Sequence, residues 1–205
     1  MPRELIDMEG LASPQVQALK NLQTPTGLPF SINKIGHVLM MVQDLNRSVK
    51  FYTQMLGFKV SDVYPDSMSK GGIVFMRCNS DHHGLGLVGA APGKTRRHEL
   101  HHIAFEIGTI DEVLRAAKHL RDNNVEIAFE GRRRAGSQVS VEFLDPDGHT
   151  LELFWAMDQV GSDGRVRPPE EWRQQGSFRG AIANAPPGQD TTLRDPSLLD
   201  HFGTD

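Results

Sequence analysis

Histidines are the residues of this sequence best suited to chemistry, and their distribution is uneven. The chain has 205 residues and nine histidines, five of which lie between positions 82 and 102. Imidazole titrates near neutral pH and is a common metal ligand, so such a cluster can transfer protons or bind a metal ion. The single cysteine, Cys78, has no histidine placed to act as its base, so a thiol nucleophile is not expected.

Two of the histidines occupy equivalent positions of an internal repeat. The segment Gly36–Val42 is similar to His101–Ile107 at an offset of 65 residues, so that His37 corresponds to His102. Each segment has the apolar pattern of a strand and leads into an amphipathic helical pattern. We therefore expect the two histidines to face each other across a pseudo-twofold axis.

The elements that position these histidines have the same order in both repeats. After the first helix, strands are predicted at Phe58–Tyr64, Gly72–Cys78 and Gly84–Val88. After the second helix, which begins at Thr109, they are predicted at Val125–Phe129, Gln138–Phe143 and Thr150–Trp155. The predicted fold class is α+β, with two paired βαβββ modules.

The composition limits the partners. Twenty-two Lys and Arg against 26 Asp and Glu give a net charge of −4, which argues against nucleic acid as the main partner. Hydrophobic residues make up 38% and charged residues 23%, and no apolar run is long enough for a membrane span. The lone cysteine and the lack of an apolar signal core favour a cytoplasmic location.

Less regular segments flank the repeat. We expect one helix at Pro14–Leu22 before it, and only Glu170–Gln175 to be helical after it. The proline-rich tail is either poorly ordered or a strap on the body or a neighbouring subunit, because Trp172 and Phe178 need cover. The expected units are an N-terminal extension (1–33), a domain (34–156, with modules of about 34–90 and 100–156) and a C-terminal tail (157–205).

Three stretches carry a resemblance to a known superfamily. They are GHVLMMVQDLNRSVKFYTQMLGFKV, HHIAFEIGTIDEV and FLDPDGHTLELF, in this order. Together they resemble the vicinal oxygen chelate superfamily, and within it the type I extradiol ring-cleaving dioxygenases. The resemblance implies that the paired modules form a curved mixed sheet around a divalent metal site.

The resemblance also implies that His37, His102 and Glu152 hold this metal. Glu152 lies in an apolar strand, where an uncompensated carboxylate would be costly. Two histidines and one carboxylate are typical of non-haem Fe(II) and leave positions for substrate and O2. Fe(II) is the expected cofactor, and Mn(II) is the alternative. Without a metal, hydrogen-bonded strand histidines and a glutamate paired with Arg or Lys would explain the same residues.

The first repeat bears on the number of ligands. The offset of 65 from Glu152 leads to Leu87, where glyoxalase I and the related epimerases have a carboxylate. Leucine cannot coordinate a metal, so a site with three protein ligands is favoured. His101, which precedes His102, is expected to point to the opposite face of its strand and to be structural.

A second histidine pair resembles the extradiol segment HH-x-L-x-L. In that segment the second histidine is the acid–base residue, and its match is His83. The chemistry needs such a group, because a bound catechol must lose protons and one must be returned. A loop histidine at the start of a strand is the alternative interpretation.

Two positions depart from the dioxygenase pattern. Glu142 stands where the family has a tyrosine that binds the substrate hydroxyl, and Arg133 stands where a further histidine approaches the substrate. These residues either shift the substrate preference toward a polar or charged catechol or mark the loss of ring cleavage. The run Arg132–Arg134 could bind a substrate carboxylate in a bidentate manner, with a solvated loop as the alternative.

The resulting hypothesis is an Fe(II)-dependent extradiol dioxygenase that cleaves a catecholic ring with O2. An O2-independent lyase, isomerase or transferase on the same scaffold and a non-catalytic protein that sequesters a ligand are the alternatives. The expected partners are a small catecholic substrate and O2, without nucleic acid or membrane. A homo-oligomer is expected, because paired-module proteins of this superfamily commonly form dimers or larger assemblies.

Overall fold

The chain folds into two modules of the predicted type. The structure is a computed structural model that describes residues 6–23, 25–26, 29–30, 32–95 and 100–203. The first module consists of β1 (Val38–Met41), α3 (Leu45–Gln54), β2 (Lys59–Tyr64), β3 (Ile73–Arg77) and β4 (Leu85–Val88). The second consists of β5 (Ile103–Glu106), α4 (Ile110–Asp122), β6 (Ile127–Arg132), β7 (Val139–Leu144) and β8 (Thr150–Trp155). The α+β class and the two βαβββ modules are therefore confirmed.

Each module forms its own four-stranded mixed sheet, with the order β1-β4-β3-β2 in the first and β5-β8-β7-β6 in the second. In both sheets the first strand pairs with the last strand in parallel, and the other pairs are antiparallel. Among the described strands, backbone pairing stops at the boundary between the modules. The expected curved sheet is therefore two separate hydrogen-bonded sheets.

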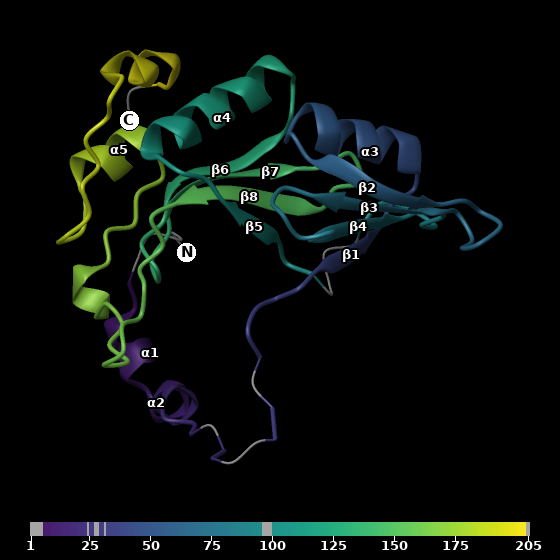
Figure 1. Ribbon diagram of the computed structural model, residues 1–205. Coiled ribbons are helices and arrows are strands. Elements are labelled where there is room, and N and C mark those ends of the chain that lie inside the picture. The colour runs from purple at the N-terminus through teal and green to yellow at the C-terminus, as the bar shows by residue number, and fades with distance from the viewer. Residues whose placement is uncertain (1–5, 24, 27–28, 31, 96–99, 204–205) are drawn as a thin grey trace.

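One helix covers the same side of each sheet (Figure 1). Asp44 caps α3 by accepting a hydrogen bond from the backbone N–H of Arg47, and Thr109 caps α4 in the same way with Glu112. Such caps satisfy donors that the first helical turn leaves without a partner. The core-facing side chains of the helices include Tyr52 on α3 and Val113, Leu114, Ala117 and Leu120 on α4.

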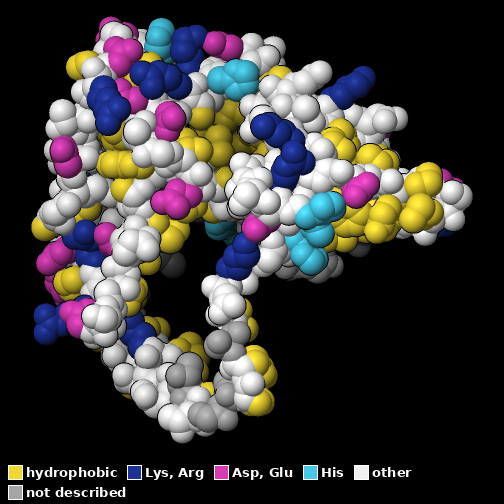
Figure 2. Space-filling model, viewed as in Figure 1, with side chains coloured by type: hydrophobic (Ala, Val, Ile, Leu, Met, Phe, Trp, Pro, Cys, Tyr) yellow, Lys and Arg dark blue, Asp and Glu magenta, His cyan; other side chains and the backbone are white. Residues whose placement is uncertain are grey.

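The other face of the first sheet carries exposed apolar side chains. On β1, Leu39 and Met41 are 43% and 50% exposed, whereas Met40 between them is 3% exposed. Val60 and Val63 on β2 are also exposed, but on the face that packs against α3, because they pair with the buried Met76 and Val74 of β3. Figure 2 shows hydrophobic side chains gathered over this end of the molecule. Exposed apolar side chains on an uncovered sheet face, such as those of Leu39 and Met41, are typical of an interaction surface.

A buried carboxylate joins the two modules. Asp147, in the β7–β8 turn, is 1% exposed and accepts three hydrogen bonds from the first module. The donors are the backbone N–H of Gln43 (2.9 Å), Nη2 of Arg47 (2.9 Å) and Oγ of Ser48 (2.8 Å). Burial opposes ionisation, but these hydrogen bonds outweigh it and hold the pKa of Asp147 below its usual value.

Together with Asp147, Asp145 forms the joint between the two modules. Its Oδ2 accepts a hydrogen bond from the Tyr52 hydroxyl at 3.0 Å and lies 2.9 Å from Nδ1 of His149. Burial, together with the nearby carboxylates of Asp145 and Asp147, raises the pKa of Tyr52 well above its usual value. The phenol therefore remains a donor, and it ties α3 to the second module.

The C-terminal segment packs on the second module. It contains η1 (Pro169–Glu171), α5 (Phe178–Ala183) and η2 (Pro196–His201). Phe178, Leu198 and Phe202 are buried in the same core cluster as α4. This packing corresponds to a strap on the body. Only part of its helical structure was expected, because α5 and η2 are too short to show a clear helical period.

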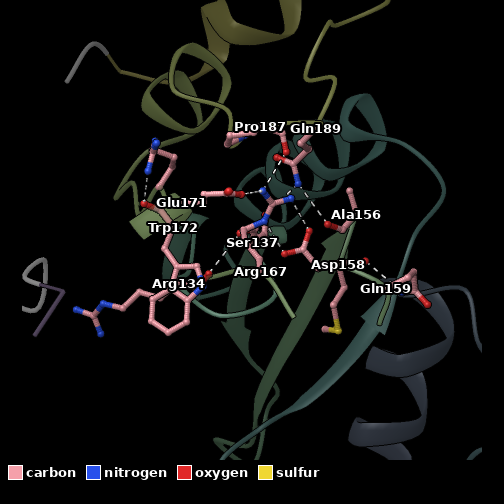
Figure 3. Close-up of polar contacts among 12 residues, drawn as sticks. Arg134, Ser137, Ala156, Asp158, Gln159, Arg167, Glu171, Trp172, Pro187 and Gln189 are labelled. Carbon is pink, nitrogen blue, oxygen red and sulfur yellow. Dashed lines mark hydrogen bonds and ion pairs between the residues drawn. The ribbon is translucent and has the colours of Figure 1, made fainter. Parts of the chain in front are cut away.

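Arg167 fastens this strap. It donates two hydrogen bonds to Asp158, at 2.8 and 2.9 Å, and further bonds to Glu171 and to the carbonyl oxygen of Pro187 (Figure 3). The hydrogen bonds that Arg167 donates to Asp158 are the largest of the causes that raise the pKa of Arg167 above its usual value. The segment after β8 is thus held by charge as well as by apolar packing.

The N-terminal segment lies below the two sheets, with α1 (Met8–Ala12) beside the C-terminal segment, where Gly10 and Leu11 line a hollow together with Trp172 and Arg134 (Figure 1). It contains α1, which the sequence did not indicate, and α2 (Pro14–Lys20), and neither helix has a buried residue. Within the described part of the chain, no helix is long and apolar enough to cross a bilayer.

Candidate functional site

The second module contains a polar cavity of about 570 Å³. Core residues occupy alternate positions of β7, at Val139, Val141 and Phe143, so Glu142 lies on the opposite face of the sheet from α4. The cavity opens on that face. Its lining comes from β6–β8 and the residues just before β5, namely His101, His102, Ala128, Arg133, Gln138, Glu142, Thr150 and Glu152.

Two of the three expected metal ligands meet in this cavity. His102 Nε2 lies 3.2 Å from Glu152 Oε2, and the two side chains are 35% and 2% exposed. The other carboxylate oxygen, Glu152 Oε1, is buried and has no hydrogen-bond partner within the described structure. An orphaned carboxylate oxygen beside an imidazole is costly unless a cation joins it. This donor pair fits one side of a divalent metal site.

The third expected ligand lies in the other module. His37 is exposed just before β1, and its ring centroid is 4.7 Å from that of His83. The His83 ring also contacts Phe75, at 4.8 Å between centroids. Across the described residues, no group of three or more His, Cys, Asp or Glu side chains is arranged to hold a metal ion. The three expected ligands therefore do not converge within one chain.

The two residues that depart from the dioxygenase pattern form an ion pair inside the cavity. Arg133 Nε and Nη2 donate to the two carboxylate oxygens of Glu142, each at 2.8 Å. On its other side, the guanidinium carbon lies 3.6 Å from the ring centroid of Phe129. Glu142 thus already occupies the bidentate fork that Arg133 was expected to offer to a substrate carboxylate.

Arg132 has a different role from Arg133. It is fully buried, so the alternative of a solvated loop is wrong for this residue. Its guanidinium donates to the carbonyl oxygens of Ser137 and Asn184 and to the side chain of Gln189. Burial is the main cause that lowers the pKa of Arg132 to about 10. Arg132 therefore anchors the C-terminal segment and does not line the cavity.

The residue equivalent to Glu152 in the first module is Gly86, not Leu87. Glu152 pairs with Ala104 across β5 and β8, and Gly86 pairs with Leu39 across β1 and β4. The offset is 65 for the first strands and 66 for the last strands, so counting at a fixed offset is wrong by one residue. A Cβ at Gly86 would lie 2.7 Å from Leu39 Cγ. Since glycine has no ligand atom, this position still contributes no carboxylate.

His101 is a cavity residue that the sequence pattern missed. Its Nδ1 lies 2.7 Å from Nδ1 of His102, and both rings line the cavity. The expectation that the two side chains point to opposite faces holds only within a strand, and β5 begins at Ile103. A histidine pair directly before a strand is the signal that could have suggested this placement.

The family is shown by residues 34–153, which match the "Glyoxalase/Bleomycin resistance protein/Dioxygenase superfamily". The chain is 30% identical over 129 residues to biphenyl-2,3-diol 1,2-dioxygenase of Paraburkholderia xenovorans, covering 62% of this chain and 42% of that protein. It thus spans about two fifths of that relative's length (42%). It is also 33% identical over 126 residues to metallothiol transferase FosB of Staphylococcus saprophyticus, covering 60% and 76% of the two chains.

Solved structures agree with this fold. The trypanothione-dependent glyoxalase I of Leishmania major superposes with a TM-score of 0.51 at 26% identity, covering 61% of this chain and 88% of that one. The fosfomycin resistance protein FosX of Listeria monocytogenes gives a TM-score of 0.51 at 23% identity, covering 62% and 96%. These likenesses concern the fold and leave the reaction open.

Proposed function

Because the chain belongs to the glyoxalase/bleomycin resistance protein/dioxygenase superfamily, we propose that it is an Fe(II)-dependent extradiol dioxygenase that cleaves a catecholic ring with O2. The observation that carries this proposal is the His102–Glu152 pair, whose orphaned Glu152 Oε1 lies in a cavity of about 570 Å³. Gly86 supports it, since a metal without a fourth protein ligand keeps positions open for substrate and O2. The likeness to a dioxygenase acting on a biphenyl diol supports the reaction class.

Each expected site residue has a role in this proposal. Fe(II), or Mn(II), would be held by His37, His102 and Glu152, and it would supply the electronic coupling between the catechol and O2. His83 would accept a proton from the catechol and return one during ring cleavage. Arg133 and Glu142 would meet the ring substituents, and a charged pair at this position favours a polar substrate.

We propose further that a second copy of the chain supplies His37 to the cavity. His37 and His83 lie together on the first module, whereas His102 and Glu152 lie on the second. In a twofold dimer, the first module of each copy can face the second module of the other, which gives two complete sites. The same contact would cover the exposed apolar face around Leu39.

The reaction is tested on protein purified without oxygen. Metal analysis should find iron or manganese, and oxygen uptake should accompany a yellow product with at least one member of a catechol panel. His102→Ala and Glu152→Gln should lose both metal and uptake. His119→Ala, on the exposed surface of α4, should retain both. Iron-loaded protein that consumes no oxygen with any catechol would overturn the proposed reaction.

The shared site is tested by mixing two inactive variants. His37→Ala and Glu152→Gln each destroy every site of their own dimers, but a mixed dimer contains one intact site. Random exchange of subunits should therefore restore about one quarter of the wild-type sites. A mixture that exchanges subunits and stays inactive and metal-free would show that one chain holds all three ligands.

An O2-independent metal-dependent transferase is the second candidate. It is favoured by the metallothiol transferase relative, of which 76% is matched, compared with 42% of the dioxygenase. This candidate predicts turnover under nitrogen and activity with Mn(II). A protein that only sequesters a ligand would instead bind that ligand without metal, and His37→Ala would leave the binding unchanged.

A further inference from the structure

We propose that Arg133 holds Glu142 away from a divalent cation bound at His102 and Glu152, and that this ion pair thereby sets the metal affinity of the cavity. Glu142 is then a latent fourth protein ligand of the metal, after His37, His102 and Glu152. The proposal rests on the metal site of the proposed function. It concerns two residues of this chain that depart from the dioxygenase pattern. Because it is a proposal about metal affinity, it does not depend on which substrate the protein uses.

Glu142 and Glu152 are placed to bind the same ion. They are directly paired across β7 and β8, they are 7% and 2% exposed, and both line the cavity. Side chains at paired positions share a face of the sheet, with Cβ atoms about 5 Å apart. A cation on the orphaned Glu152 Oε1 is therefore within reach of a carboxylate that extends from Glu142.

Arg133 pairs with both oxygens of the Glu142 carboxylate. Both oxygens of Glu142 accept a hydrogen bond from the guanidinium at 2.8 Å, and Phe129 supports the guanidinium from the other side at 3.6 Å. The two neighbouring carboxylates are thus in opposite states. Glu142 has a partner for each oxygen, whereas Glu152 keeps one oxygen without a partner in the described structure.

Because Arg133 and Glu142 carry opposite charges, the proposal predicts opposite changes in metal affinity when each of them is neutralised. Arg133 repels a nearby cation and also removes a ligand, so its loss should strengthen metal binding. Loss of the Glu142 charge leaves Arg133 without its counter-ion beside the metal, so it should weaken metal binding. An ion pair that only stabilises the fold would not give opposite effects, because both single substitutions remove the same interaction.

The experiment measures Mn²⁺ binding to the full-length chain, from the electron paramagnetic resonance signal of the free ion. Arg133→Met should bind Mn²⁺ about tenfold more tightly than the wild type, and Glu142→Gln about tenfold more weakly, as expected for a unit charge several ångströms from the ion. The double variant should return close to the wild-type affinity. With Co²⁺, Arg133→Met should change the visible absorption, because a further oxygen joins the metal.

Two variants separate the outcomes. Arg133→Lys keeps the charge but not the bidentate fork, and it should fall between the wild type and Arg133→Met even if the latter folds poorly. If Glu152→Gln loses Mn²⁺ binding but Arg133→Met and Arg133→Lys bind no more tightly than the wild type, the metal site stands and the role of Arg133 is wrong. If Glu152→Gln binds Mn²⁺ as well as the wild type does, the metal site and this inference both fail.

Discussion

The two modules have the same topology but different surroundings. The outer face of the first sheet is open and apolar, with Leu39 and Met41 exposed. The outer face of the second sheet holds the polar cavity, and the C-terminal segment packs around its helix. What the modules share, namely strand order, helix caps and a common joint, serves folding. What they do not share, above all Glu152 opposite Gly86 in the repeat, points to function.

The same contrast appears between two buried acids of the second module. Asp147 has donors for its oxygens and joins the modules, whereas Glu152 keeps one oxygen without a partner within the described residues. A buried carboxylate that is fully hydrogen-bonded stabilises the fold, and one that is not must gain a ligand or destabilise it.

The largest effect is expected for Glu152→Gln. Loss of a ligand charge should weaken Mn²⁺ binding by more than about 100-fold, because even the partners of metal ligands are worth tenfold to 100-fold. The free energy of unfolding of the metal-free protein should change by less than about 1 kcal/mol, since glutamine can still bind His102. Titration with Mn²⁺ measures the metal affinity, and urea unfolding in the presence of a chelator measures the stability of the metal-free protein. A large loss of metal-free stability would mean that Glu152 is structural.

The opposite pattern is expected for Asp147→Ala. It leaves the Gln43 N–H and the Ser48 hydroxyl without their acceptor, and it removes the partner of Arg47. The free energy of unfolding should fall by about 3 kcal/mol, which urea unfolding measures. The control is Asp44→Asn at the N-cap of α3, the helix that Asp147 contacts, because asparagine caps as well as aspartate does. Equal stability of the two variants would remove Asp147 from the joint.

Most of the fold could be predicted from the sequence, because apolar periodicity and capping signals are local. The last strand, Thr150–Trp155, has the predicted bounds, and each of the other predicted strands overlaps an observed one. The strap could not be predicted in detail, since Phe178 and Phe202 are buried by tertiary contacts that leave no periodic signal. A fixed repeat offset likewise cannot show one inserted residue. For this reason the offset of 65 pointed to Leu87, whereas the strand registers make Gly86 the equivalent of Glu152.

The site was predicted less completely, for a physical reason. Resemblance can match ligand positions, and the cavity brings His102 and Glu152 together. It cannot say whether two modules of one chain or of two chains complete the site, because the relation between modules depends on buried contacts such as those of Asp147. The pairing of Arg133 with Glu142 was also hidden, since it joins the residue just after β6 to a residue of β7, and the sequence does not state the register of these two strands.

A smaller effect is expected for Arg132→Met. This substitution tests how the C-terminal segment, which packs on the second module, is held there. The substitution removes three hydrogen bonds, two of which hold the C-terminal segment through Asn184 and Gln189, whereas the third goes to the carbonyl oxygen of Ser137. Part of the loss is offset because a buried guanidinium is costly, so the free energy of unfolding should fall by about 2 kcal/mol. Hydrogen exchange should rise in 178–202 and stay unchanged in the first module.

The matched control for that variant is Arg165→Met, whose side chain is 88% exposed. It removes a charge of the same type from the C-terminal segment itself, without breaking a buried contact. Its stability and its hydrogen exchange should equal those of the wild type. If Arg132→Met also leaves the exchange of 178–202 unchanged, apolar packing alone holds the strap.

Acid should weaken the joint through Asp147. Its pKa is below the usual value in the folded state, so it contributes stability above about pH 4 that is lost as the pH falls through the lowered pKa. Asp111 should also lose a stabilising contribution in acid. Hydrogen bonds from the backbone N–H groups of Arg194 and Asp195 outweigh the effect of burial and lower the pKa of Asp111. Between pH 5 and pH 3, the stability difference between wild type and Asp147→Asn should shrink by about 1 kcal/mol. A difference that is constant with pH would contradict the lowered pKa.

The smallest effect tests what the modules share. Asp44 and Thr109 accept from the backbone N–H three residues later, at 3.0 and 3.2 Å, at equivalent positions of α3 and α4. Asp44→Ala and Thr109→Ala should therefore each lower the free energy of unfolding by about 1 kcal/mol, which urea unfolding resolves. Neither should alter Mn²⁺ binding, because both caps lie on the helix side of their sheets. A clear loss of metal affinity from one cap would mean that helix and cavity are coupled, and the division between shared structure and unshared function would then fail in that module.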